Sequence, residues 1–444
     1  MAEEAIKPEY RKTDIGIIPE DWKMIPLSQV GEIIDGDRGT HYPNSNDFSE
    51  DGYCLFLSAK NVTKTGFEFD ECQFISKDKD ECLGKGKLKR GDIVLTTRGT
   101  VGNIAFFDNT VKFENIRINS GMVIIRIDAT KKATREYYYK LCQSKLLSNQ
   151  IDRLAFGSAQ PQLTVKGIST FHFPLPPTKE EQTAIATALS DTDALIESLN
   201  KLIKKKKNIK QGAMQELLTG KKRLPGFSNL NGKPNNYKQT EVGIIPEDWE
   251  VNKVKDFTDA TSGGTPSTFR PEYWNGNIRW MNSGELNLKK VYDVEGRISE
   301  LGLRNSSTKL IPEKCILIGL AGQGKTRGTV AINYVELCTN QSIGAIYPND
   351  SFVSEYLYYN LDSRYNEFRN LSTGASGRGG LNLTLIRNLL VPLPQDQNEQ
   401  SAIAQVLSDM DAEIEELEQK RDKYLQLKAG MMQQLLTGKI RLKW

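Results

Sequence analysis

The stretch Thr178–Leu218, TKEEQTAIATALSDTDALIESLNKLIKKKKNIKQGAMQELL, decides the fold, because the chain contains its pattern twice. The second copy is Asp396–Leu436, DQNEQSAIAQVLSDMDAEIEELEQKRDKYLQLKAGMMQQLL, 218 residues further on (178 to 396). In both copies the apolar positions recur at alternating steps of four and three, the spacing of a coiled-coil seam. Each stretch predicts a helix about 60 Å long at about 1.5 Å per residue, which is too long for the core of one small domain.

The two seams are most simply explained if they pair with each other. A pseudo-twofold axis would then relate the copies and make the helices antiparallel. Basic residues interrupt the seam, and an ordinary helix pair with polar defects or a place where a partner subunit packs would explain them equally well. The seam positions are Ile185, Leu189, Thr192, Ile196, Leu199, Ile203, Lys206, Lys210, Ala213 and Leu217 in the first helix, and Ile403, Leu407, Met410, Ile414, Leu417, Arg421, Tyr424, Lys428, Met431 and Leu435 in the second.

Both long helices have predicted ends. Thr178 with Glu181, and Asp396 with Glu399, have the spacing of a capping box, in which each side chain bonds the other residue's free backbone donor. A glycine of the motif LLTGK follows each helix, where a left-handed C-cap favours glycine.

The repeat extends beyond the helices, and the sequence between its repeated motifs diverges. This pattern indicates two copies of one domain plus one helix, with a fixed scaffold and a variable part. The repeated motifs are GIIPEDW (Gly16–Trp22 and Gly243–Trp249), TRGTV (Thr97–Val101 and Thr326–Val330), a tyrosine-rich stretch (Glu136–Leu141 and Tyr356–Leu361) and a Pro-Leu-Pro strap (Pro174–Pro176 and Pro392–Pro394).

The predicted fold class is α+β, with two globular mixed α/β domains separated by two long helices that form an antiparallel intramolecular coiled coil. Strands are predicted at 92–96, 122–127 and 314–318, and helices at 134–147 and 354–370 with Thr134 and Ser354 as N-caps. The predicted boundaries are 1–175 for the first domain, 176–222 for the first helix, 223–240 for a Gly-, Pro- and Asn-rich linker, 241–393 for the second domain and 394–444 for the second helix.

Composition gives broad limits only. The chain has 444 residues, a net charge of +3 and no apolar run long enough to span a membrane. Six cysteines without a CxxC spacing favour buried thiols over disulfides or zinc. The first residues, MAEEAIKPEYRK, contain no apolar segment, so we expect no secretion signal and a cytoplasmic location.

One motif formally matches a phosphate-binding P-loop. Gly319–Thr326, GLAGQGKT, follows a predicted strand. A working P-loop must open a helix, whereas the following residues, RGTVAINYV, are β-branched and strand-like. The equivalent stretch of the first copy, before Thr97, lacks both the glycines and the lysine. A variable glycine loop with a basic tip is the favoured interpretation, and a nucleotide-hydrolysing enzyme is a minor alternative.

We find no other sequence pattern that predicts catalysis. The two histidines, His41 and His172, have no counterparts in the other copy, so a proton-shuttling or zinc site is not favoured. The chain lacks the Asn- or Asp-Pro-Pro-aromatic motif of an amino-methyltransferase. We therefore expect a non-catalytic chain with no cofactor or metal of its own.

Recognition remains, and duplicated, divergent domains suit a ligand with two separated half-sites. Duplex DNA is such a ligand, since its major groove returns about every 34–36 Å. Base edges are read by Arg, Lys, Asn and Gln side chains on loops held by a scaffold. The candidate DNA-binding residues are Lys85, Lys87, Lys89, Arg90, Arg98, Gln160 and Gln162 in the first copy and Lys325, Arg327, Arg378 and Asn382 in the second.

These motifs also carry a resemblance that covers essentially the whole chain. GIIPEDW, the strap followed by Glu-Gln and Ala-Ile-Ala, Leu-Ser-Asp-x-Asp and LLTGK, each present twice, resemble the specificity subunit of type I restriction–modification systems. The resemblance implies two target-recognition domains, each reading one half of an asymmetric, interrupted DNA sequence.

The same resemblance implies the partners. The paired helices would set the spacing between the half-sites and dock two methyltransferase (modification) subunits, and Leu189, Ile196, Leu407, Met410, Ile414, Leu417 and Met431 are the candidate docking residues. S-adenosylmethionine, ATP and Mg would bind to the modification and the restriction/translocase subunits. A coiled-coil adaptor without DNA specificity of its own is the main alternative.

Overall fold

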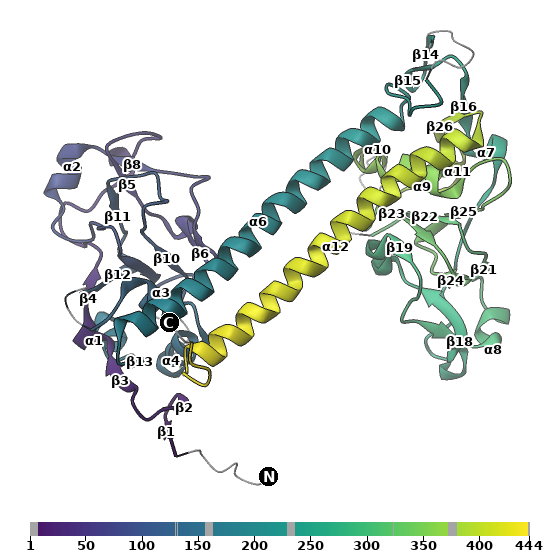
Figure 1. The fold of residues 1–444 in the computed structure, drawn as a ribbon. Coiled ribbons are helices and arrows are strands. Elements are labelled where there is room, and N and C mark those ends of the chain that lie inside the picture. Colours follow the sequence, from purple (N-terminus) through teal and green to yellow (C-terminus); the bar gives the residue numbers. More distant parts are fainter. Residues whose placement is uncertain are drawn as a thin grey trace. The chain divides into compact units, whose positions relative to one another are not determined.

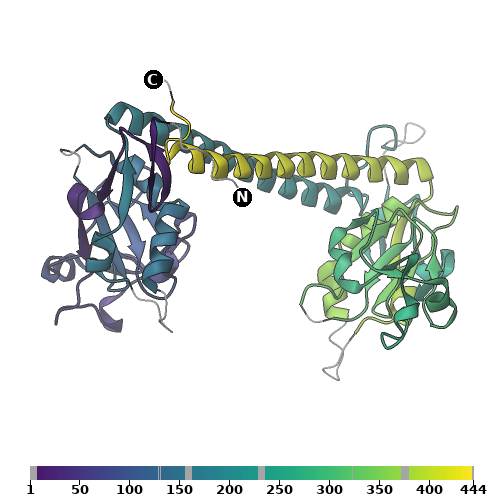
Figure 2. The ribbon, with the colours of Figure 1, turned by 90° about the horizontal axis from the view of Figure 1, so that it is seen from below.

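The computed structural model describes residues 8–128, 130, 132–155, 163–228, 236–322, 324–371 and 380–442. The chain forms two compact units: unit 1 is Met1–Leu199 with Lys420–Trp444, and unit 2 is Asn200–Gln419. Each unit contains mixed sheets, short helices and a part of both long helices, α6 (Lys179–Leu217) and α12 (Gln397–Leu435) (Figure 1 and Figure 2). Both helices are within one residue of their predicted bounds at each end.

Unit 1 is built on an antiparallel four-stranded sheet in the order β10-β9-β12-β4. A three-stranded sheet, β11-β5-β8, and the hairpin β6–β7 accompany it. In the smaller sheet β11 is parallel to β5. The strands are β4 (Gly31–Asp35), β5 (Cys54–Phe56), β6 (Val62–Thr63), β7 (Gly66–Phe67), β8 (Phe74–Ile75), β9 (Ile93–Thr96), β10 (Ile104–Phe106), β11 (Ile116–Arg117) and β12 (Met122–Ile127).

Unit 2 has a five-stranded sheet, β17-β25-β22-β23-β19, and a four-stranded sheet, β20-β18-β24-β21. In the second of these β18 is parallel to β24. The strands are β17 (Ala260–Ser262), β18 (Trp274–Met281), β19 (Lys290–Val291), β20 (Arg297–Ile298), β21 (Leu310–Ile311), β22 (Ile316–Gly319), β23 (Val330–Asn333), β24 (Leu337–Thr339) and β25 (Ile343–Ile346).

The two sets of sheets share one topology although their sequences diverge. The strands β10, β9, β12 and β4 correspond in order and direction to β23, β22, β25 and β17. The order β11-β5-β8 corresponds to β24-β18-β20, and each smaller sheet contains one parallel pair. Unit 2 adds β19 and β21 at sheet edges. The variable part of the repeat therefore keeps a common framework.

The central sheet of each unit is buried on both faces, which explains its continuous apolar strands. In β12, Val123, Ile125 and Ile127 belong to the core that contains the helices, whereas Met122 and Ile124 belong to the core shared with the smaller sheet. Successive side chains of a strand point to opposite faces, so both sets must be apolar. The strands predicted at 92–96, 122–127 and 314–318 are confirmed as β9, β12 and β22. Strand β22 begins two residues later and ends one residue later than predicted.

Short helices complete each unit. In unit 1 they are α1 (Leu27–Val30), the 3-10 helices Ser45–Asp47 and Ala59–Asn61, α2 (Lys77–Cys82), α3 (Arg135–Cys142), α4 (Lys145–Ala155) and α5 (Val165–Ser169). In unit 2 they are α7 (Val254–Phe257), the 3-10 helices Pro271–Tyr273 and Ser283–Leu288, α8 (Glu300–Arg304), α9 (Ser354–Asp362), α10 (Tyr365–Leu371) and α11 (Leu383–Arg387).

The prediction of single helices over 134–147 and 354–370 is wrong, because each stretch is broken into two. Of their predicted N-caps, Thr134 is confirmed as the cap residue of α3, although its side chain makes no capping hydrogen bond, and Ser354 is wrong by one residue, because it is already inside α9. Glutamines of the long helices bond the amides of the two cap residues: Gln182 Oε1 accepts from the Thr134 amide at 2.9 Å, and Gln400 Oε1 accepts from the Val353 amide at 2.8 Å. A tertiary contact thus holds the start of each short helix.

The repeated motifs meet at one junction in each unit. GIIPEDW supplies the second strand of a hairpin: β1 (Tyr10–Thr13) pairs with β2 (Gly16–Pro19) in unit 1, and β14 (Tyr237–Thr240) pairs with β15 (Gly243–Pro246) in unit 2. The next strand pairs with the Pro-Leu-Pro strap, as β3 (Lys23–Pro26) with β13 (His172–Leu175) and as β16 (Trp249–Lys253) with β26 (Leu390–Pro394).

The glycine that ends each long helix packs against this junction. Gly220 and Gly438 have φ of +68° and +67°, which confirms the predicted left-handed C-caps. A Cβ atom at Gly438 would lie 2.6 Å from Pro19 Cδ, and one at Gly220 would lie 2.3 Å from Pro246 Cδ. These positions therefore require glycine both for backbone conformation and for space.

The predicted capping boxes are only half formed. The Glu181 amide donates to Thr178 Oγ1 at 3.2 Å, as expected. The Glu181 carboxylate, however, accepts from Arg441 Nη2 at 2.8 Å, and Arg441 also pairs with Asp21 at 3.0 Å. The capping function of the glutamate is lost to an ion pair that joins the start of α6 to the residues after α12.

Unit 2 repeats this ion pair at equivalent positions. Arg223 Nη2 lies 2.6 Å from Glu399 Oε2 and 2.9 Å from Asp248 Oδ2. Trp249 Nε1 donates to the same Glu399 oxygen at 3.2 Å. Arg223 was predicted to begin a linker, but its side chain is buried in this junction, with 3% of its surface exposed.

Within each unit the paired parts of α6 and α12 run antiparallel, as predicted. In unit 1, Lys428 Nζ lies 2.5 Å from Asp193 Oδ1. In unit 2, Lys210 pairs with Asp411, the equivalent residues with the helices exchanged, and Lys206 Nζ lies 2.5 Å from Glu413 Oε1. Three of the basic residues that interrupt the seam, Lys206, Lys210 and Lys428, are thus paired with acidic residues of the other helix, whereas Arg421 pairs with Asp422 of its own helix.

Candidate nucleic-acid interface

Variable loops gather at one edge of each central sheet. In unit 1, β4 and β9 end at this edge and β10 and β12 begin there, since Val123 pairs with Asp35 and Met122 with Thr96. In unit 2 the ends of β17 and β22 and the starts of β23 and β25 meet in the same way. The other ends of these strands lie near the repeated junction, where the Asp128 amide donates to Val30 O. We call this set of loops the loop edge: 36–44, 97–103 and 119–121 in unit 1, and 263–270, 320–329 and 340–342 in unit 2.

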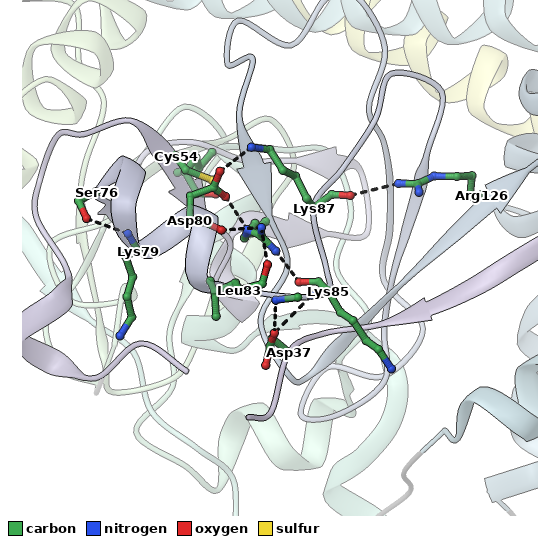
Figure 3. A network of polar contacts seen from close by, with 12 residues as sticks. Asp37, Cys54, Ser76, Lys79, Asp80, Leu83, Lys85, Lys87 and Arg126 are labelled. Carbon is green, nitrogen blue, oxygen red and sulfur yellow. Dashed lines mark hydrogen bonds and ion pairs between the residues drawn. The ribbon is translucent and has the colours of Figure 1, made fainter. Parts of the chain in front are cut away.

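Close backbone contacts hold the loop edge of unit 1. A Cβ atom at Gly36 would lie 2.3 Å from Asn119 O, so the first loop and the turn before β12 are in direct backbone contact. The Thr97 amide donates to Gly121 O at 2.8 Å. Asp37 Oδ2 accepts from the Gly84 amide at 2.8 Å and from the Lys85 amide at 3.3 Å, and Figure 3 shows Asp37 below Lys85. Hydrogen bonds from backbone amides, foremost that of Gly39, lower the pKa of Asp37.

A buried ionic cluster supports the adjacent loop. Asp80 and Arg117 are 1% and 5% exposed, and Arg117 Nε lies 2.5 Å from Asp80 Oδ1. Arg117 also donates to the carbonyl oxygens of Leu83 at 2.9 Å and Lys85 at 2.6 Å. Burial alone would raise the pKa of Asp80, but hydrogen bonds from Lys87 and Arg117 lower it by more, so the pKa of this carboxyl lies below its ordinary value. Figure 3 shows the Lys87 ammonium directed at Asp80, 2.5 Å from Oδ2.

The predicted DNA-binding residues of unit 1 fall into two groups. Lys85, Lys89 and Arg98 are exposed, with Arg98 in the β9–β10 loop of the loop edge. Lys87 pairs with Asp80, and Arg90 stacks 4.1 Å from the Phe107 ring centroid while donating to the carbonyl oxygens of Val111 and Phe113. Lys87 and Arg90 therefore have structural partners within the domain, and their predicted role in DNA binding remains a prediction.

Gln160 and Gln162 lie outside the described residues. The chain next to them is fixed at the loop edge, because the Leu163 amide donates to Thr97 O at 3.2 Å. The equivalent bond in unit 2 joins the Leu381 amide to Leu320 O at 2.9 Å, next to the undescribed Arg378.

The loop edge of unit 2 is held by equivalent contacts. A Cβ atom at Gly263 would lie 1.9 Å from Thr339 O, as at Gly36 in unit 1. The Leu320 amide donates to Ser342 O at 2.8 Å. The same framework therefore presents loops of different sequence in the two units.

The predicted residues of unit 2 are spread over two places. Lys325 is exposed and Arg327 is half-buried, both in the β22–β23 loop. Asn382 caps α11, since its Oδ1 accepts from the Leu385 amide at 2.9 Å. The sequence analysis missed Phe269, whose side chain is 93% exposed in the loop after β17. Its signal was weak, because an isolated phenylalanine in a polar stretch has no periodicity.

The P-loop match does not have the geometry of a phosphate site. β22 and β23 are antiparallel neighbours, with Ile316 opposite Ile332, and the Gly328 amide donates to Gly319 O at 2.9 Å. The residues after Lys325 thus enter a strand rather than the helix that a P-loop must open. The prediction that a strand follows the motif is confirmed.

The candidate docking residues of the long helices lie in their mutual seam. Leu189 and Leu407 are fully buried, Ile196 and Ile414 are buried, and Met410, Leu417 and Met431 are half-buried. Other apolar residues point outward: Leu195, Leu202 and Ile209, seven residues apart on α6, are 36%, 38% and 45% exposed, and Leu425 and Leu427 on α12 are 46% and 51% exposed. The seam itself is occupied by the chain, so the outward residues are the better candidates for a partner contact.

Grooves lie beside the repeated junction in both units. In unit 1 it has a volume of about 410 Å³ and is lined by Asp14, Ile15 and Thr170–His172 among others. In unit 2 the equivalent residues Glu241, Val242 and Asn388–Leu390 line a groove of about 820 Å³.

Catalytic and metal-binding constellations are not found among the described residues. No group of three His, Cys, Asp or Glu side chains in the described ranges is placed to hold a metal ion. The six cysteines are free thiols, and burial raises the pKa of Cys54 and Cys315 to about 12. No helix of the described ranges is long and apolar enough to cross a membrane. Rigid loops with polar and basic side chains suit the reading of a ligand surface rather than bond making.

Comparisons with known proteins agree on one family. The type I restriction modification DNA specificity domain matches this chain twice, over residues 19–210 and 246–426. The putative type I restriction enzyme MjaX specificity subunit of Methanocaldococcus jannaschii is 25% identical over 441 residues, which are 98% of this chain and 97% of that protein. The MjaVIII specificity subunit of the same organism is 26% identical over 445 residues, covering 96% and 94%. The crystal structure of the type I restriction–modification S subunit from M. genitalium has a TM-score of 0.59 at 14% identity, over 97% of this chain and 99% of that one, a similarity of fold.

Proposed function

The chain belongs to the family of type I restriction–modification DNA specificity subunits, and from this premise we propose that each unit reads one half of a two-part, asymmetric DNA sequence. As a member of this family the chain is a non-catalytic subunit that binds the DNA target site. The observation that carries the two-reader proposal is the loop edge. Apart from the repeated motif TRGTV, equivalent strands present loops of different sequence in the two units, as two readers of different half-sites require.

The loop residues have the chemistry for this task. Arginine, lysine, asparagine and glutamine hydrogen-bond base edges in the major groove, and exposed basic residues pair with phosphates. Lys85 and Arg98 in unit 1 and Lys325 and Arg327 in unit 2 are the residues of the proposed interface that the structure describes at or beside a loop edge. The proposal assigns Lys87 and Arg90 a supporting role, because their charged groups are already engaged within the domain.

We further propose that the long helices set the spacing of the half-sites and dock two methyltransferase subunits. Each helix is a single element of 39 residues that belongs partly to unit 1 and partly to unit 2. Support for two copies of one partner comes from the groove that recurs at equivalent residues of both units. S-adenosylmethionine would bind to these partners, and ATP and Mg to them or to the restriction subunits.

The test exchanges the recognition part of one unit. Residues 31–170 are replaced by the corresponding segment of another specificity subunit, which leaves the scaffold strands β1–β3 and β13 in place. The chimera is expressed with its methyltransferase, and methylated adenines are mapped in host DNA. We expect only one half of the methylated sequence to change. The matched exchange of residues 258–388 should change only the other half.

Two results would contradict this proposal. A change in both halves, or in neither, means that the units do not read half-sites independently. A wild-type complex that prefers no duplex sequence favours the coiled-coil adaptor, for which the outward leucines of α6 and α12 would be the docking residues.

A further inference from the structure

The loop Gly263–Arg270 of unit 2 presents one aromatic side chain almost completely to solvent. Phe269 is 93% exposed, whereas the next most exposed large apolar residue of the described ranges, Tyr292, is 62% exposed. Tyr292 is moreover stacked on Tyr334, with ring centroids 4.8 Å apart. Single exposed apolar residues are common on protein surfaces, so exposure alone decides nothing. The anchoring and position of Phe269 are the deciding observations.

The backbone on both sides of Phe269 is anchored. Trp280 Nε1 donates to Gly264 O at 3.0 Å, and Trp274 Nε1 donates to Ser267 O at 3.1 Å. The two indoles pack edge to face, with centroids 5.1 Å apart. On the other side of the tip, the Arg270 amide donates to Ser267 O at 3.3 Å. Because these hydrogen bonds fix the backbone of the loop, the exposed ring is presented to a ligand at little entropic cost.

The neighbours of Phe269 are those of a nucleic-acid surface. Arg270 is adjacent, with a side chain 65% exposed. Gln341, on the turn before β25, accepts from Thr265 Oγ1 at 2.6 Å and is itself exposed. Lys309 Nζ donates to Thr261 Oγ1 at 2.8 Å, next to the start of the loop. An amide, two cations and an aromatic ring thus lie on or beside one loop edge.

The equivalent loop of unit 1 presents different chemistry on the same framework. It is Gly36–Asn44, which exposes Arg38 and His41. Tyr42, at the position equivalent to Phe269, is half-buried, packs edge to face on Phe56 with ring centroids 5.8 Å apart, and accepts from the Ser120 amide at 3.3 Å. The aromatic residue at this position is therefore engaged within the domain in unit 1 and exposed to solvent in unit 2, as expected if only Phe269 contacts a base.

We propose that Phe269 is a specificity-determining residue, which makes an apolar contact with a base in the DNA half-site read by unit 2. This inference rests on the proposed function. Apolar side chains discriminate bases either by contact with the thymine methyl group or by insertion between base steps, and an anchored phenylalanine ring beside Arg270 suits such a contact. Arg270, which lies 3.5 Å from Glu272 in the free chain, would supply the neighbouring phosphate contact.

The experiment measures sequence preference in the assembled complex. The full chain and its methyltransferase subunit methylate a duplex library in which both half-sites are randomised, and the methylated sequences are counted. With Phe269→Ala we expect the discrimination at one or two adjacent base pairs of one half-site to fall about tenfold, within the range measured for single mismatched base pairs. The other half-site should be unchanged. Because the readout is a ratio, it is insensitive to the active fraction of the preparation.

A matched variant provides the control. Ile244→Ala removes an apolar side chain that is 56% exposed in the same unit but lies on β15, at the repeated junction. It should leave all base preferences unchanged. Unaltered preferences with Phe269→Ala, or an equal loss in both half-sites, would overturn the inference. If the wild-type complex selects a two-part site while Phe269→Ala is neutral, the proposed function stands and only the role of Phe269 is wrong.

Discussion

Replacement of Arg441 by methionine tests whether the Arg–Glu ion pair, which occurs once in each unit, stabilises the unit that contains it. Glu181 is fully buried, with 0% of its surface exposed, and Arg441 Nη2 lies 2.8 Å from its Oε2. Burial raises the pKa of the Glu181 carboxyl, and the Arg441 guanidinium opposes that shift. Arg441→Met removes the opposing charge and leaves a buried carboxylate without its cation.

The expected loss of local stability in unit 1 is about 3 kcal/mol at pH 7, the lower end of the range of about 3–5 for breaking a buried ion pair. The lower end applies because the Arg441 side chain is 38% exposed, so water can replace part of its contact. Arg223→Met in unit 2 is the matched comparison. Its side chain is 3% exposed and its partner Glu399 is 1% exposed, so the loss there should be the larger of the two.

The sign of the pH dependence follows from the raised pKa. A carboxyl whose folded-state pKa lies above its unfolded value of about 4.3 favours the folded state most below that value, and this contribution is lost as the pH rises through the folded pKa. Without Arg441 the pKa of Glu181 should rise further. The destabilisation by Arg441→Met should therefore be greatest at pH 7–8 and shrink towards pH 5.

Hydrogen exchange measured by mass spectrometry reads this effect locally. Protection should fall in β1–β2 and in the last turns of α12, while the unit 2 junction serves as the internal reference. Glu181→Gln combined with Arg441→Met should recover much of the loss, because a neutral amide needs no cation. A loss independent of pH, or an equal loss in both units, would refute the assignment of the effect to the buried carboxylate.

Two further predictions concern single residues. Gly438→Ala should destabilise unit 1 by about 2 kcal/mol or more, because φ is +67° and the new Cβ would lie 2.6 Å from Pro19 Cδ. Gly430→Ala, inside α12 with no neighbour within 4 Å, should instead stabilise unit 1 by about 0.5–1 kcal/mol. Denaturant unfolding of both variants checks these opposite signs. Asp80→Asn should destabilise the recognition part of unit 1 at pH 7. Because the folded-state pKa of Asp80 is lowered, its stabilising contribution is present above the unfolded pKa of about 3.9 and is lost as the pH falls through the folded pKa. Unfolding curves of the variant and the wild type should therefore converge below about pH 4, and a constant difference down to pH 3 would argue against the ionic cluster.

The sequence by itself determined the repeat, the long helices and their ends. Apolar residues at steps of four and three dictate which face of a helix is buried, and this local rule does not depend on the rest of the fold. Glycine at Gly220 and Gly438 likewise reflects a local backbone conformation. The same local signals missed that each shorter stretch is broken into two helices, and they gave no sign of the glutamines of α6 and α12 that bond the starts of α3 and α9 across a long sequence separation.

The tertiary structure shows which candidate residues are exposed and which have partners within their own unit. Lys87 and Arg90 lie in a basic stretch of the sequence. In the fold, however, Lys87 pairs with Asp80, and Arg90 donates to the carbonyl oxygen of Val111. The loop edge forms because antiparallel pairing brings the ends of β4 and β9 beside the starts of β10 and β12, and such long-range pairing has no signature in local spacing. For the same reason the local sequence did not indicate that Phe269 is exposed. Its exposure depends on two tryptophans that hold the loop, and their contacts across the loop are not encoded by the residues next to it.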